Sequence, residues 1–508
     1  MMAQLTTYPI LLQLLLGIIL MFAWNNVKLQ RIISILGSIV GVVVAVVLFI
    51  SIWNDGTQIV EAGSWPAPFS IVFVADIFAA TLVLLTSFAG LAVASFSSAT
   101  VMPLRLKFGY FPIFHFLLLG LNGAFLTGDL FNLYVWFEII IISSFVLITI
   151  GGEKAQLEGA VKYFTLNILA SMIFLTAIAV LYGLSGSLNM ADLALKVAQI
   201  ENRTLVEVTA ILFFVGFGIK SAVFPLYFWL PASYHTPPPA VSAIFGGLLT
   251  KVGVYALIRV FTLIFPDEVF LRDIFIVVAV LTLFSGAIGA LVQNNIRKVF
   301  SYLIICHIGF MIAGLGMFTE VAIAGAIFYL IHDIMVKTNL FMISGLIYRL
   351  KGSNSIRALG GLYEDFPKIS LLIIASFCSL VGLPPFSGFW PKLSLLTEAF
   401  KIENYWIVGA ILLASFLTLF IIWKLWSEVF WKKSELKTSS SSYLFNHDMK
   451  YHRRIQMLAP IIFITIISLY IGFAAENIQV LSERIADELM NPQPYIDAVL
   501  NKTEILEL

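Results

Sequence analysis

The stretch KSAVFPLYFWLP, residues 220–231, decides the fold class, because it sets a lysine and two prolines inside a segment that is otherwise apolar enough to cross a membrane. A second stretch, CSLVGLPPFSGFWPKLSLL at residues 378–396, repeats the combination of prolines, small residues and a lysine. A proline kink that only shapes helix packing is the simpler interpretation of either stretch alone. Two such stretches in one chain favour discontinuous membrane helices, whose freed backbone groups line a polar cavity.

The composition of the 508 residues indicates a protein that lives in a lipid bilayer. Hydrophobic residues make up 60% of the chain and charged residues only 12%, and the mean hydropathy is +0.98. The 30 basic residues nearly balance the 29 acidic ones, so the bulk charge gives no indication of a nucleic acid partner. Both cysteines, Cys306 and Cys378, lie in apolar stretches, which argues against a disulfide framework and a cysteine metal site. We therefore expect an all-α polytopic membrane protein.

Apolar runs long enough to cross about 30 Å of hydrocarbon predict about 14 transmembrane helices. In chain order the expected spans are 8–27, 31–53, 71–97, 110–128, 130–150, 160–183, 206–231, 238–265, 272–292, 298–318, 321–348, 370–400, 404–431 and 456–475. The loops between them alternate in charge, with 17 lysines and arginines on one side of the membrane and six on the other. Because basic loops stay in the cytoplasm, this alternation predicts that both termini lie outside.

A constant offset of 166 residues relates two parts of the chain, for example in the pairs Gly159 and Gly325, Tyr163 and Tyr329, and Pro225 and Pro391. The offset contains five spans, an odd number, so the second unit would be inverted relative to the first, as in many secondary transporters. The predicted organisation has three N-terminal helices in 1–109, a first five-helix repeat of helices 4–8 in 110–265, and a second repeat of helices 9–13 in 266–431. A cytoplasmic loop, the last span and a tail follow in 432–508. Helices 7 and 12 are expected to be discontinuous.

Among the ionisable side chains inside the expected spans, five are the main candidates for transport, namely Glu138, Lys220, Lys251, Lys337 and Lys392. A charge at the bilayer centre costs about 2.5 to 3.5 kcal/mol even on the lenient insertion scale, so the five are expected to form a proton or ion path. A lysine near a carboxylate can gain and lose a proton as the carboxylate moves or is neutralised. Glu138 and Lys220 are therefore a candidate element of a pump. A static buried ion pair that fixes helix packing is the alternative.

The stretch GAIFYLIHDIMVKTNLF, residues 325–341, adds a histidine, His332, five residues before Lys337. Histidine titrates near neutral pH and suits a relay between lysines, although a buried histidine can be purely structural. Asp333 and Lys337, at positions i and i+4, are expected to pair within their helix. Weaker candidates, which could cap helices or line cavities, are His307, Asp76 and Arg259.

Four stretches together resemble the antiporter-like membrane subunits shared by Mrp-type multisubunit sodium/proton antiporters and respiratory complex I. They are GDLFNLYVWFEI at 128–139, KSAVFPLYFWLPASYHTPPPAVSAIFGGLLTKVGVYALIR at 220–259, NNIRKVFSYLIICHIGFMIAG at 294–314 and GLPPFSGFWPK at 382–392. The resemblance covers roughly residues 70–430, and the first two stretches and the length are most similar to the MrpD branch of the family. Some complex I relatives carry glutamate where this chain has Lys392.

The resemblance implies functional roles for particular residues. The functional set of that family is a glutamate on helix 5, lysines on helices 7, 8, 11 and 12, and a histidine on helix 11. Those motifs correspond here to Glu138, Lys220, Lys251, His332, Lys337 and Lys392. The resemblance also implies a multi-pass protein of the bacterial plasma membrane that works inside a hetero-oligomer of small and large membrane subunits. It implies no ATP hydrolysis, no cofactor and no resident metal.

The hypothesis from the sequence is therefore a secondary transporter subunit rather than an enzyme. Protons would move along the midplane series from Glu138 and Lys220 to Lys392, and the proton-motive force would drive sodium out of the cell. The chain carries no P-loop, dinucleotide fingerprint or metal-ligand cluster that would favour other chemistry. Two alternatives stay open: the proton-pumping module of a complex I or hydrogenase-like redox complex, and a scaffold subunit whose buried charges only hold helices together. The acidic tail of 33 residues after the last span is expected to be solvated, with contact to a partner as the alternative.

Overall fold

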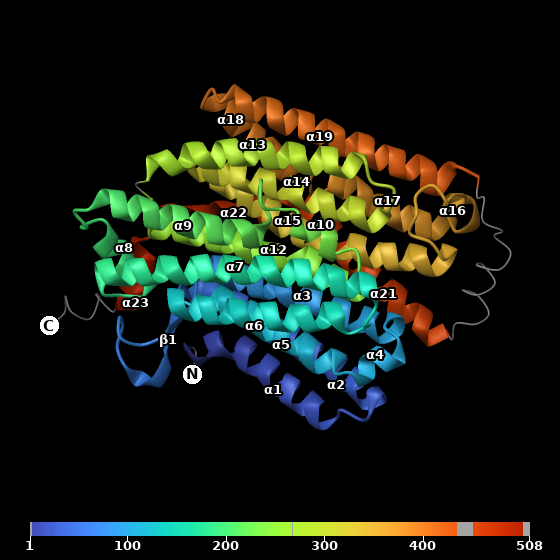
Figure 1. Ribbon diagram of the computed structural model, residues 1–508, viewed down its shortest axis with the longest axis horizontal. Coiled ribbons are helices and arrows are strands. Elements are labelled where there is room, and N and C mark those ends of the chain that lie inside the picture. The colour runs from blue at the N-terminus through green and yellow to red at the C-terminus, as the bar shows by residue number, and fades with distance from the viewer. Residues whose placement is uncertain (1–2, 267, 434–450, 501–508) are drawn as a thin grey trace.

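The computed structural model describes residues 3–266, 268–433 and 451–500. Its long helices lie side by side in one bundle, with α1 (Tyr8–Phe22) and α2 (Val27–Asp55) at one edge and α19 (Tyr405–Trp426) at the opposite edge (Figure 1). The other spanning helices are α3 (Ile77–Thr100), α5 (Tyr110–Leu126), α6 (Leu130–Thr149), α7 (Lys154–Ser185), α9 (Arg203–Ser221), α11 (Pro239–Ile244), α12 (Thr250–Leu263), α13 (Val269–Leu291), α14 (Ile296–Met317), α15 (Glu320–Lys351), α17 (Pro367–Val381), α18 (Phe389–Lys401) and α21 (Tyr451–Phe473).

Short elements connect and cap these helices. They are the 3-10 turns η1 (Ala3–Thr7) and η2 (Ala62–Ser64), the π-helical turns η3 (Phe245–Leu249) and η4 (Ser427–Trp431), and the helices α4 (Pro103–Lys107), α8 (Met190–Val197), α10 (Trp229–Ser233), α16 (Leu362–Asp365), α22 (Ala475–Met490) and α23 (Gln493–Leu500). Strands β1 (Gln58–Glu61) and β2 (Val72–Ala75) form an antiparallel hairpin in which Gln58 pairs with Ala75.

The predicted number of spans is confirmed in the described part of the chain. Twelve helical segments are long and apolar enough to cross a membrane, and two shorter apolar helices, Tyr110–Leu126 and Pro367–Val381, complete the set of 14. The ends of the described chain lie on the same side of the bundle (Figure 1), as an even number of crossings requires. Two basic residues that contributed to the predicted orientation, Lys437 and Lys450, lie outside the described residues.

Side-chain caps explain where several of these apolar helices begin. Asp76 accepts a hydrogen bond from the backbone N–H of Ala79 at 2.8 Å, and Asp129 accepts one from Asn132 at 2.7 Å. Each cap satisfies one of the first N–H groups of a helix, which have no partner within the helix itself. The caps therefore hold the starts of α3 and α6 at fixed positions in the chain.

Both predicted discontinuous helices are present. α9 ends at Ser221, where Ala222 adopts a left-handed conformation with φ of 59°, and the chain resumes a helix only at α10. α17 ends at Val381 before Gly382, with φ of 81°, and α18 begins seven residues after Gly382, at Phe389. Glycine adopts this backbone region without steric cost, which suits the second break. The inverted relation of the two five-helix units and their boundaries stay a prediction.

The centre of the bundle is formed by α11–η3–α12, α14 and α15. The apolar window of Pro239–Leu263 is entirely buried inside the protein, and those of α14 and α15 are 94% buried, whereas the window of α2 is only 33% buried. Ionisable residues in the middle of these helices, namely Lys251, His307, His332, Asp333 and Lys337, are therefore shielded from lipid and from solvent by protein.

The expectation that the C-terminal tail is solvated is wrong for residues 475–500. α22 packs an apolar face against α15, α3 and α12 and buries Ile478, Leu481 and Ile485. Its charged side chains lie on the other face, which gives the tail its acidic composition without making it disordered. Burial, followed by the nearby charge of Asp76, raises the pKa of the Glu488 carboxyl. The remaining tail, 501–508, lies outside the described residues.

Candidate functional site

Lys220 lies in the last turn of α9, directly before the break. Its Nζ donates a hydrogen bond to Ser171 Oγ on α7 at 3.1 Å and lies 4.7 Å from the centroid of the Phe137 ring on α6. The side chain is buried. The C-terminal end of a helix carries a partial negative charge, so the end of α9 is a favourable place for an ammonium group that has no carboxylate in contact.

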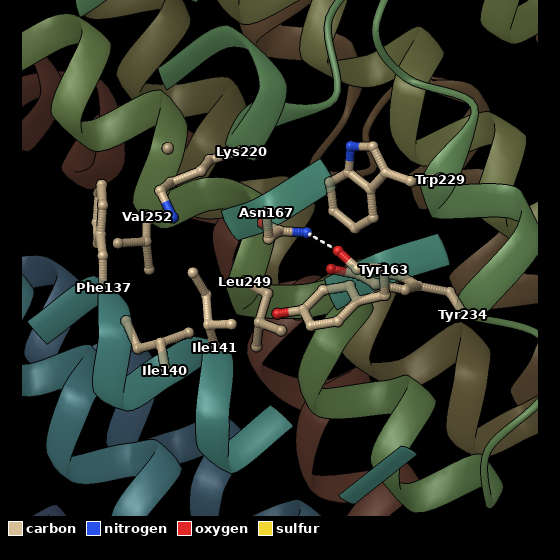
Figure 2. Close-up of a pocket in the computed structure, with 11 residues that line it drawn as sticks. Phe137, Ile140, Ile141, Tyr163, Asn167, Lys220, Trp229, Tyr234, Leu249 and Val252 are labelled. Carbon is tan, nitrogen blue, oxygen red and sulfur yellow. Dashed lines mark hydrogen bonds between the residues drawn. The ribbon is translucent and has the colours of Figure 1, made fainter. Parts of the chain in front are cut away.

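A small cavity opens beside the Lys220 amine. It is lined by polar groups of Tyr163 and Asn167 among apolar side chains such as Phe137 and Val252 (Figure 2). Its volume is about 20 Å³, which is room for about one water molecule. Asn167 Nδ2 donates to the Tyr163 carbonyl at 2.9 Å. The cavity can therefore hold a hydrogen-bonding group between Lys220 and the polar groups of α7.

Glu138 does not contact Lys220, contrary to the expected close pair. Among the described residues no ion pair joins them, and Phe137 rather than Glu138 lies against the amine. One carboxylate oxygen, Glu138 Oε1, is buried without a hydrogen-bond partner in the described chain. The static ion-pair interpretation of these two residues therefore has no contact to support it.

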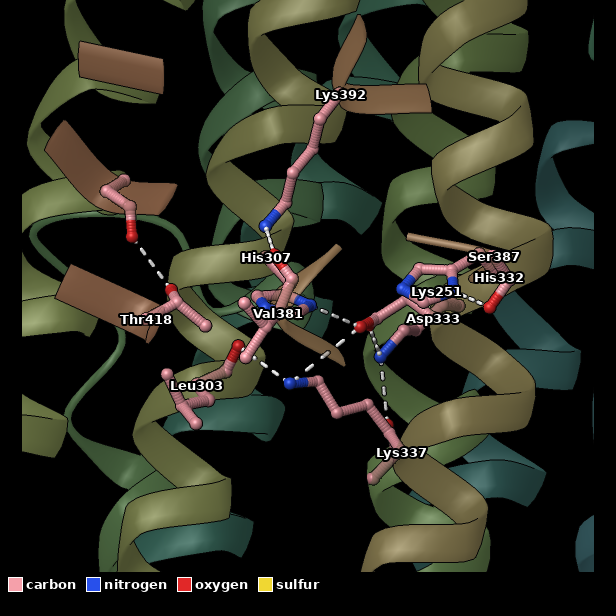
Figure 3. Close-up of polar contacts among 12 residues, drawn as sticks. Lys251, Leu303, His307, His332, Asp333, Lys337, Val381, Ser387, Lys392 and Thr418 are labelled. Atoms are coloured by element: carbon pink, nitrogen blue, oxygen red, sulfur yellow. Dashed lines mark hydrogen bonds and ion pairs between the residues drawn. The ribbon is translucent and has the colours of Figure 1, made fainter. Parts of the chain in front are cut away.

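Asp333, on α15, is the centre of the polar contacts in the second part of the site (Figure 3). Its Oδ2 lies 2.7 Å from Lys251 Nζ on α12, and its Oδ1 lies 2.7 Å from His307 Nδ1 on α14. The expected pair with Lys337 is confirmed, with 3.8 Å between Lys337 Nζ and Asp333 Oδ1. All four side chains are fully buried. One carboxylate therefore joins three bases from three helices.

The π-helical turn η3 positions Lys251 against α15. Lys251 Nζ donates a hydrogen bond to the Gly246 carbonyl, inside this turn, at 2.9 Å. A Cβ at Gly247 would lie 2.0 Å from Thr338 Oγ1, so only glycine allows this approach of η3 to α15. π-helical turns are rare and occur often at functional sites. A Cβ at Gly253 would similarly meet Ser221 at 2.5 Å, which brings the Lys220 end of α9 against the helix that carries Lys251.

Lys337 and Lys392 both reach backbone carbonyls. Lys337 Nζ donates to the Leu303 carbonyl at 3.0 Å. Lys392, in the first turn of α18, reaches back across the break and donates to the Val381 carbonyl at the end of α17, at 2.7 Å. Because Val381 is the last residue of α17, Lys392 places its charge at the negative end of that half-helix. The two breaks thus resemble each other in having a buried lysine beside the C-terminal end of a half-helix.

His332 connects the second break to the Asp333 cluster. Its Nδ1 forms a hydrogen bond with Ser387 Oγ, in the segment between α17 and α18, at 2.8 Å (Figure 3). Its Nε2 has no hydrogen-bond partner in the described chain. A Cβ at Gly388 would lie 3.0 Å from the imidazole ring, so the break packs closely against it. Within the described residues, the His332 ring therefore bonds the break between α17 and α18 through one nitrogen and keeps the other nitrogen unbonded.

Two residues of this cluster, Asp333 and His307, have more contacts than the sequence predicts. Asp333 was expected only as an intrahelical partner of Lys337, but its contact with Lys251 is shorter by more than an ångström. His307 was a weaker candidate, and it contacts the same carboxylate. Both are ionisable residues inside apolar spans, which was the available signal. Their meeting depends on the packing of α12, α14 and α15, which spacing along one helix does not reveal.

The buried lysines Lys220, Lys251, Lys337 and Lys392 are called the lysine series below, and two carboxylates, Glu138 and Asp333, accompany them. If all six groups were charged, the bundle would hold a net positive charge. Burying uncompensated charge is strongly unfavourable, which opposes protonation of all four amines at once. A proton on one lysine disfavours a proton on its neighbour, and the shared Asp333 stabilises whichever base is charged. In the described residues, no group of three or more His, Cys, Asp or Glu is placed to hold a metal ion.

The sequence and the fold are similar to those of several known proteins. Residues 127–418 match the family described as NADH:quinone oxidoreductase/Mrp antiporter, TM. The D subunit of the Na(+)/H(+) antiporter of Alkalihalophilus pseudofirmus is 40% identical over 99% of this chain and 100% of its own length. The protein of the same name from Bacillus subtilis is 40% identical over 97% of this chain and 99% of its own length.

Two solved complexes contain chains with the same fold. One is the Mrp complex from Dietzia sp. DQ12-45-1b, with a TM-score of 0.88 and 27% identity over 98% of this chain and 99% of that chain. The other is the membrane-bound sulfane sulfur reductase, an archaeal respiratory membrane complex, with a TM-score of 0.88 and 26% identity over 98% of this chain and 100% of that chain.

Proposed function

The chain belongs to the NADH:quinone oxidoreductase/Mrp antiporter family, and on that premise we propose that it is the proton-translocating subunit of a multisubunit sodium/proton antiporter. The similarity over nearly the full length to the Na(+)/H(+) antiporter proteins of two bacteria supports this assignment. The observation that carries it is the series of buried lysines from α9 through α12 and α15 to α18, in which Lys251 and Lys337 share the Asp333 carboxylate.

The proposed path begins with Glu138 and Lys220 and continues through Lys251, His332 with Lys337, and Lys392. Each amine has a neutral oxygen or a shared carboxylate as its partner, so it keeps a hydrogen bond in either protonation state. Proton transfer along the series would use side-chain rotations and water in cavities such as that beside Lys220. The inverted repeats would supply access from the two faces of the membrane.

Partners and location follow from the same relatives. The Mrp complex from Dietzia supports an assembly with other membrane subunits. We place the chain in the bacterial plasma membrane with both termini outside, on the basis of its basic loops and its 14 crossings. The antiporter relatives support a transporter rather than an enzyme, with sodium and protons as its substrates.

Replacement of Lys220 by alanine tests the proposal. In everted vesicles that hold normal amounts of the assembled complex, sodium-dependent proton exchange should fall to background, because the first amine of the path is lost. Lys162→Ala, at an exposed lysine on α7, is the matched control and should leave exchange unchanged. Normal exchange in the Lys220→Ala complex would show that the lysine series does not carry the protons.

A redox-driven proton module is the second candidate, because the sulfane sulfur reductase complex contains a chain of the same fold. The sequence identity of 40% to an antiporter D subunit exceeds the 26% identity to the chain of the sulfane sulfur reductase, which favours the antiporter assignment. Co-purification of the tagged chain distinguishes them: small cation-antiporter subunits are expected, whereas electron-transfer subunits would overturn the antiporter assignment. A purely structural scaffold predicts instead that charge-neutralising variants lose assembly and exchange in equal proportion.

A further inference from the structure

A second buried polar region lies in the N-terminal helices, away from the lysine series. A cavity of about 10 Å³ is enclosed by α1, α2, α3 and α5, with room for about one small ion or water molecule. In Figure 1, α1, α2 and α5 lie at the edge of the bundle opposite α13 and α19. The polar side chains that line the cavity are Gln13, Ser38, Thr86, Ser87 and Asn122.

Three oxygens at this cavity have no hydrogen-bond partner in the described chain: Ser38 Oγ, Thr86 Oγ1 and Asn122 Oδ1. Their residues, and Gln13, are each at most 5% exposed. Serine and threonine in apolar helices usually donate to a carbonyl one turn earlier, as Thr81 does to Ile77 at 2.7 Å. A buried polar atom without a partner is costly, so three on one cavity indicate a ligand that binds oxygen.

Asn122 is oriented for such a ligand. Its Nδ2 donates to the Pro9 carbonyl at 3.3 Å, which leaves Oδ1, an acceptor only, for the cavity. Gln13 can add a fourth oxygen. His115 bonds Gln13 through Nδ1 at 2.7 Å and Ser34 through Nε2 at 2.9 Å. Because Ser34 can donate or accept, the other tautomer of His115 would accept from Gln13 Nε2 and turn Oε1 toward the cavity.

The charge around the cavity differs from that around the lysine series. No lysine or arginine lines this cavity, whereas an amine lines the one beside Lys220. A metal cation is repelled by the lysine path but not by neutral oxygens. Hard cations prefer oxygen ligands, and a site without a carboxylate holds a monovalent cation weakly enough to release it, as transport requires.

Polar groups continue from the cavity toward both ends of these helices. In one direction His115 leads to Ser34 and then to Gln30, whose Nε2 donates to the Trp24 carbonyl at 2.8 Å, beyond the end of α1. In the other direction Asn122 reaches Pro9, and the Thr6 hydroxyl lies nearby in sequence, buried and without a hydrogen-bond partner in the described chain. The cavity therefore lies along a polar line through an otherwise apolar group of helices.

We propose that this cavity is a binding site for Na⁺, with Ser38, Thr86, Asn122 and the turned amide of Gln13 as its side-chain ligands. The proposal rests on the proposed antiporter function for the identity of the cation. It places a sodium site in this chain, separate from the proton path, so that the two ions would cross the same subunit through different helices.

Two variants test the site in the assembled complex. Thr86→Val removes a hydroxyl but keeps the shape of the side chain, and Asn122→Leu removes the amide oxygen. Each should raise the KM for Na⁺ in everted vesicles about tenfold, because each loses one bond to a charged group. The maximal exchange rate at saturating Na⁺ should stay within about twofold, since the proton path is intact. Thr81→Val, on the same helix and equally buried but bonded to Ile77, is the matched control and should leave the KM unchanged.

A third variant guards against misassembly of Asn122→Leu. A Cβ at Gly41 would lie 3.4 Å from Gln13 Nε2, an ordinary contact, so Gly41→Ala should fold while it narrows the cavity and raises the KM. An unchanged KM for Na⁺ in Thr86→Val and Gly41→Ala, with normal amounts of complex, would overturn the proposal and leave the cavity with a structural water only.

Thermal unfolding of the purified complex separates this proposal from the antiporter assignment. Added NaCl, compared with choline chloride, should raise the unfolding temperature of the Thr81→Val complex more than that of the Thr86→Val complex, because a bound ion stabilises the folded state. The same rise should persist in Lys220→Ala, where exchange is lost. An equal rise in Thr81→Val and Thr86→Val would contradict the sodium site, whatever the outcome of the exchange experiment.

Discussion

At the scale of single residues, Asp333 has the largest number of charged partners in the lysine series. It contacts Lys251 and His307 at 2.7 Å and lies 3.8 Å from Lys337. Neutralising it leaves two amines without a counter-charge inside a fully buried cluster. Breaking a buried pair by removal of one partner typically costs about 3 to 5 kcal/mol, unless the remaining group gives up its charge.

We therefore expect Asp333→Asn to abolish sodium-dependent proton exchange, because the lysines would stay neutral and could no longer pass a proton. The unfolding temperature should fall only modestly, since neutral lysines avoid the cost of a buried charge. Exchange in vesicles and thermal unfolding of the complex measure the two effects. Asp273→Asn, at an exposed aspartate on α13, is the control. Exchange at the normal rate in Asp333→Asn would remove the carboxylate from the mechanism.

At the scale of elements, spans and breaks could be predicted from sequence because they are local. The fourteen apolar runs predict the positions of the helices, and the two proline-rich stretches contain the observed ends of α9 and α17. The contact of Lys251 with Asp333 joins residues 82 positions apart on different helices, and it depends on the packing of η3 against α15. The prediction of a solvated tail was wrong for a related reason. The tail is acidic in composition, but its apolar residues recur at helical spacing, and they become buried only when α22 packs on the bundle.

The glycine at position 247 controls the distance between Lys251 and Asp333. In Gly247→Ala the new methyl group would lie 2.0 Å from Thr338 Oγ1, so η3 must move away from α15. Overpacking of this kind costs about 1 to 3 kcal/mol, and the displacement should also lengthen the ion pair and slow exchange. Exchange normalised to the amount of complex, together with the unfolding temperature, measures both effects.

A second substitution tests this explanation of Gly247→Ala. Thr338→Ala removes the hydroxyl that the new methyl would meet, so Gly247→Ala with Thr338→Ala should recover part of the lost exchange. Gly183→Ala on α7, where a Cβ would meet nothing within 4 Å, should be neutral or slightly stabilising. No recovery in the double variant would mean that the glycine matters for the conformation of the π-helical turn rather than for close packing.

At the scale of the whole molecule, one buried ion pair joins parts of the chain that are far apart in sequence. Arg259 on α12 pairs with Asp76, the N-cap of α3, and Tyr495 on α23 covers the guanidinium with its ring centroid 5.3 Å away. The N-terminal helices, the centre of the bundle and the C-terminal tail therefore meet at this pair. Arg259 lies about two helical turns from Lys251 on the same helix. The pair therefore has two candidate roles, to stabilise the folded protein or to take part in the proton path.

The geometry favours stability, because Arg259 keeps its charge at any pH a cell tolerates and cannot relay a proton. Arg259→Met should therefore destabilise the protein by about 3 to 5 kcal/mol, since Asp76 would be left as an unpaired buried carboxylate. Asp76→Asn with Arg259→Met should recover most of that loss, because asparagine still caps α3 without a charge. Thermal unfolding measures the stability, and exchange per assembled complex should stay normal in both variants. Loss of exchange in a double variant of normal stability would instead assign the pair to the proton path.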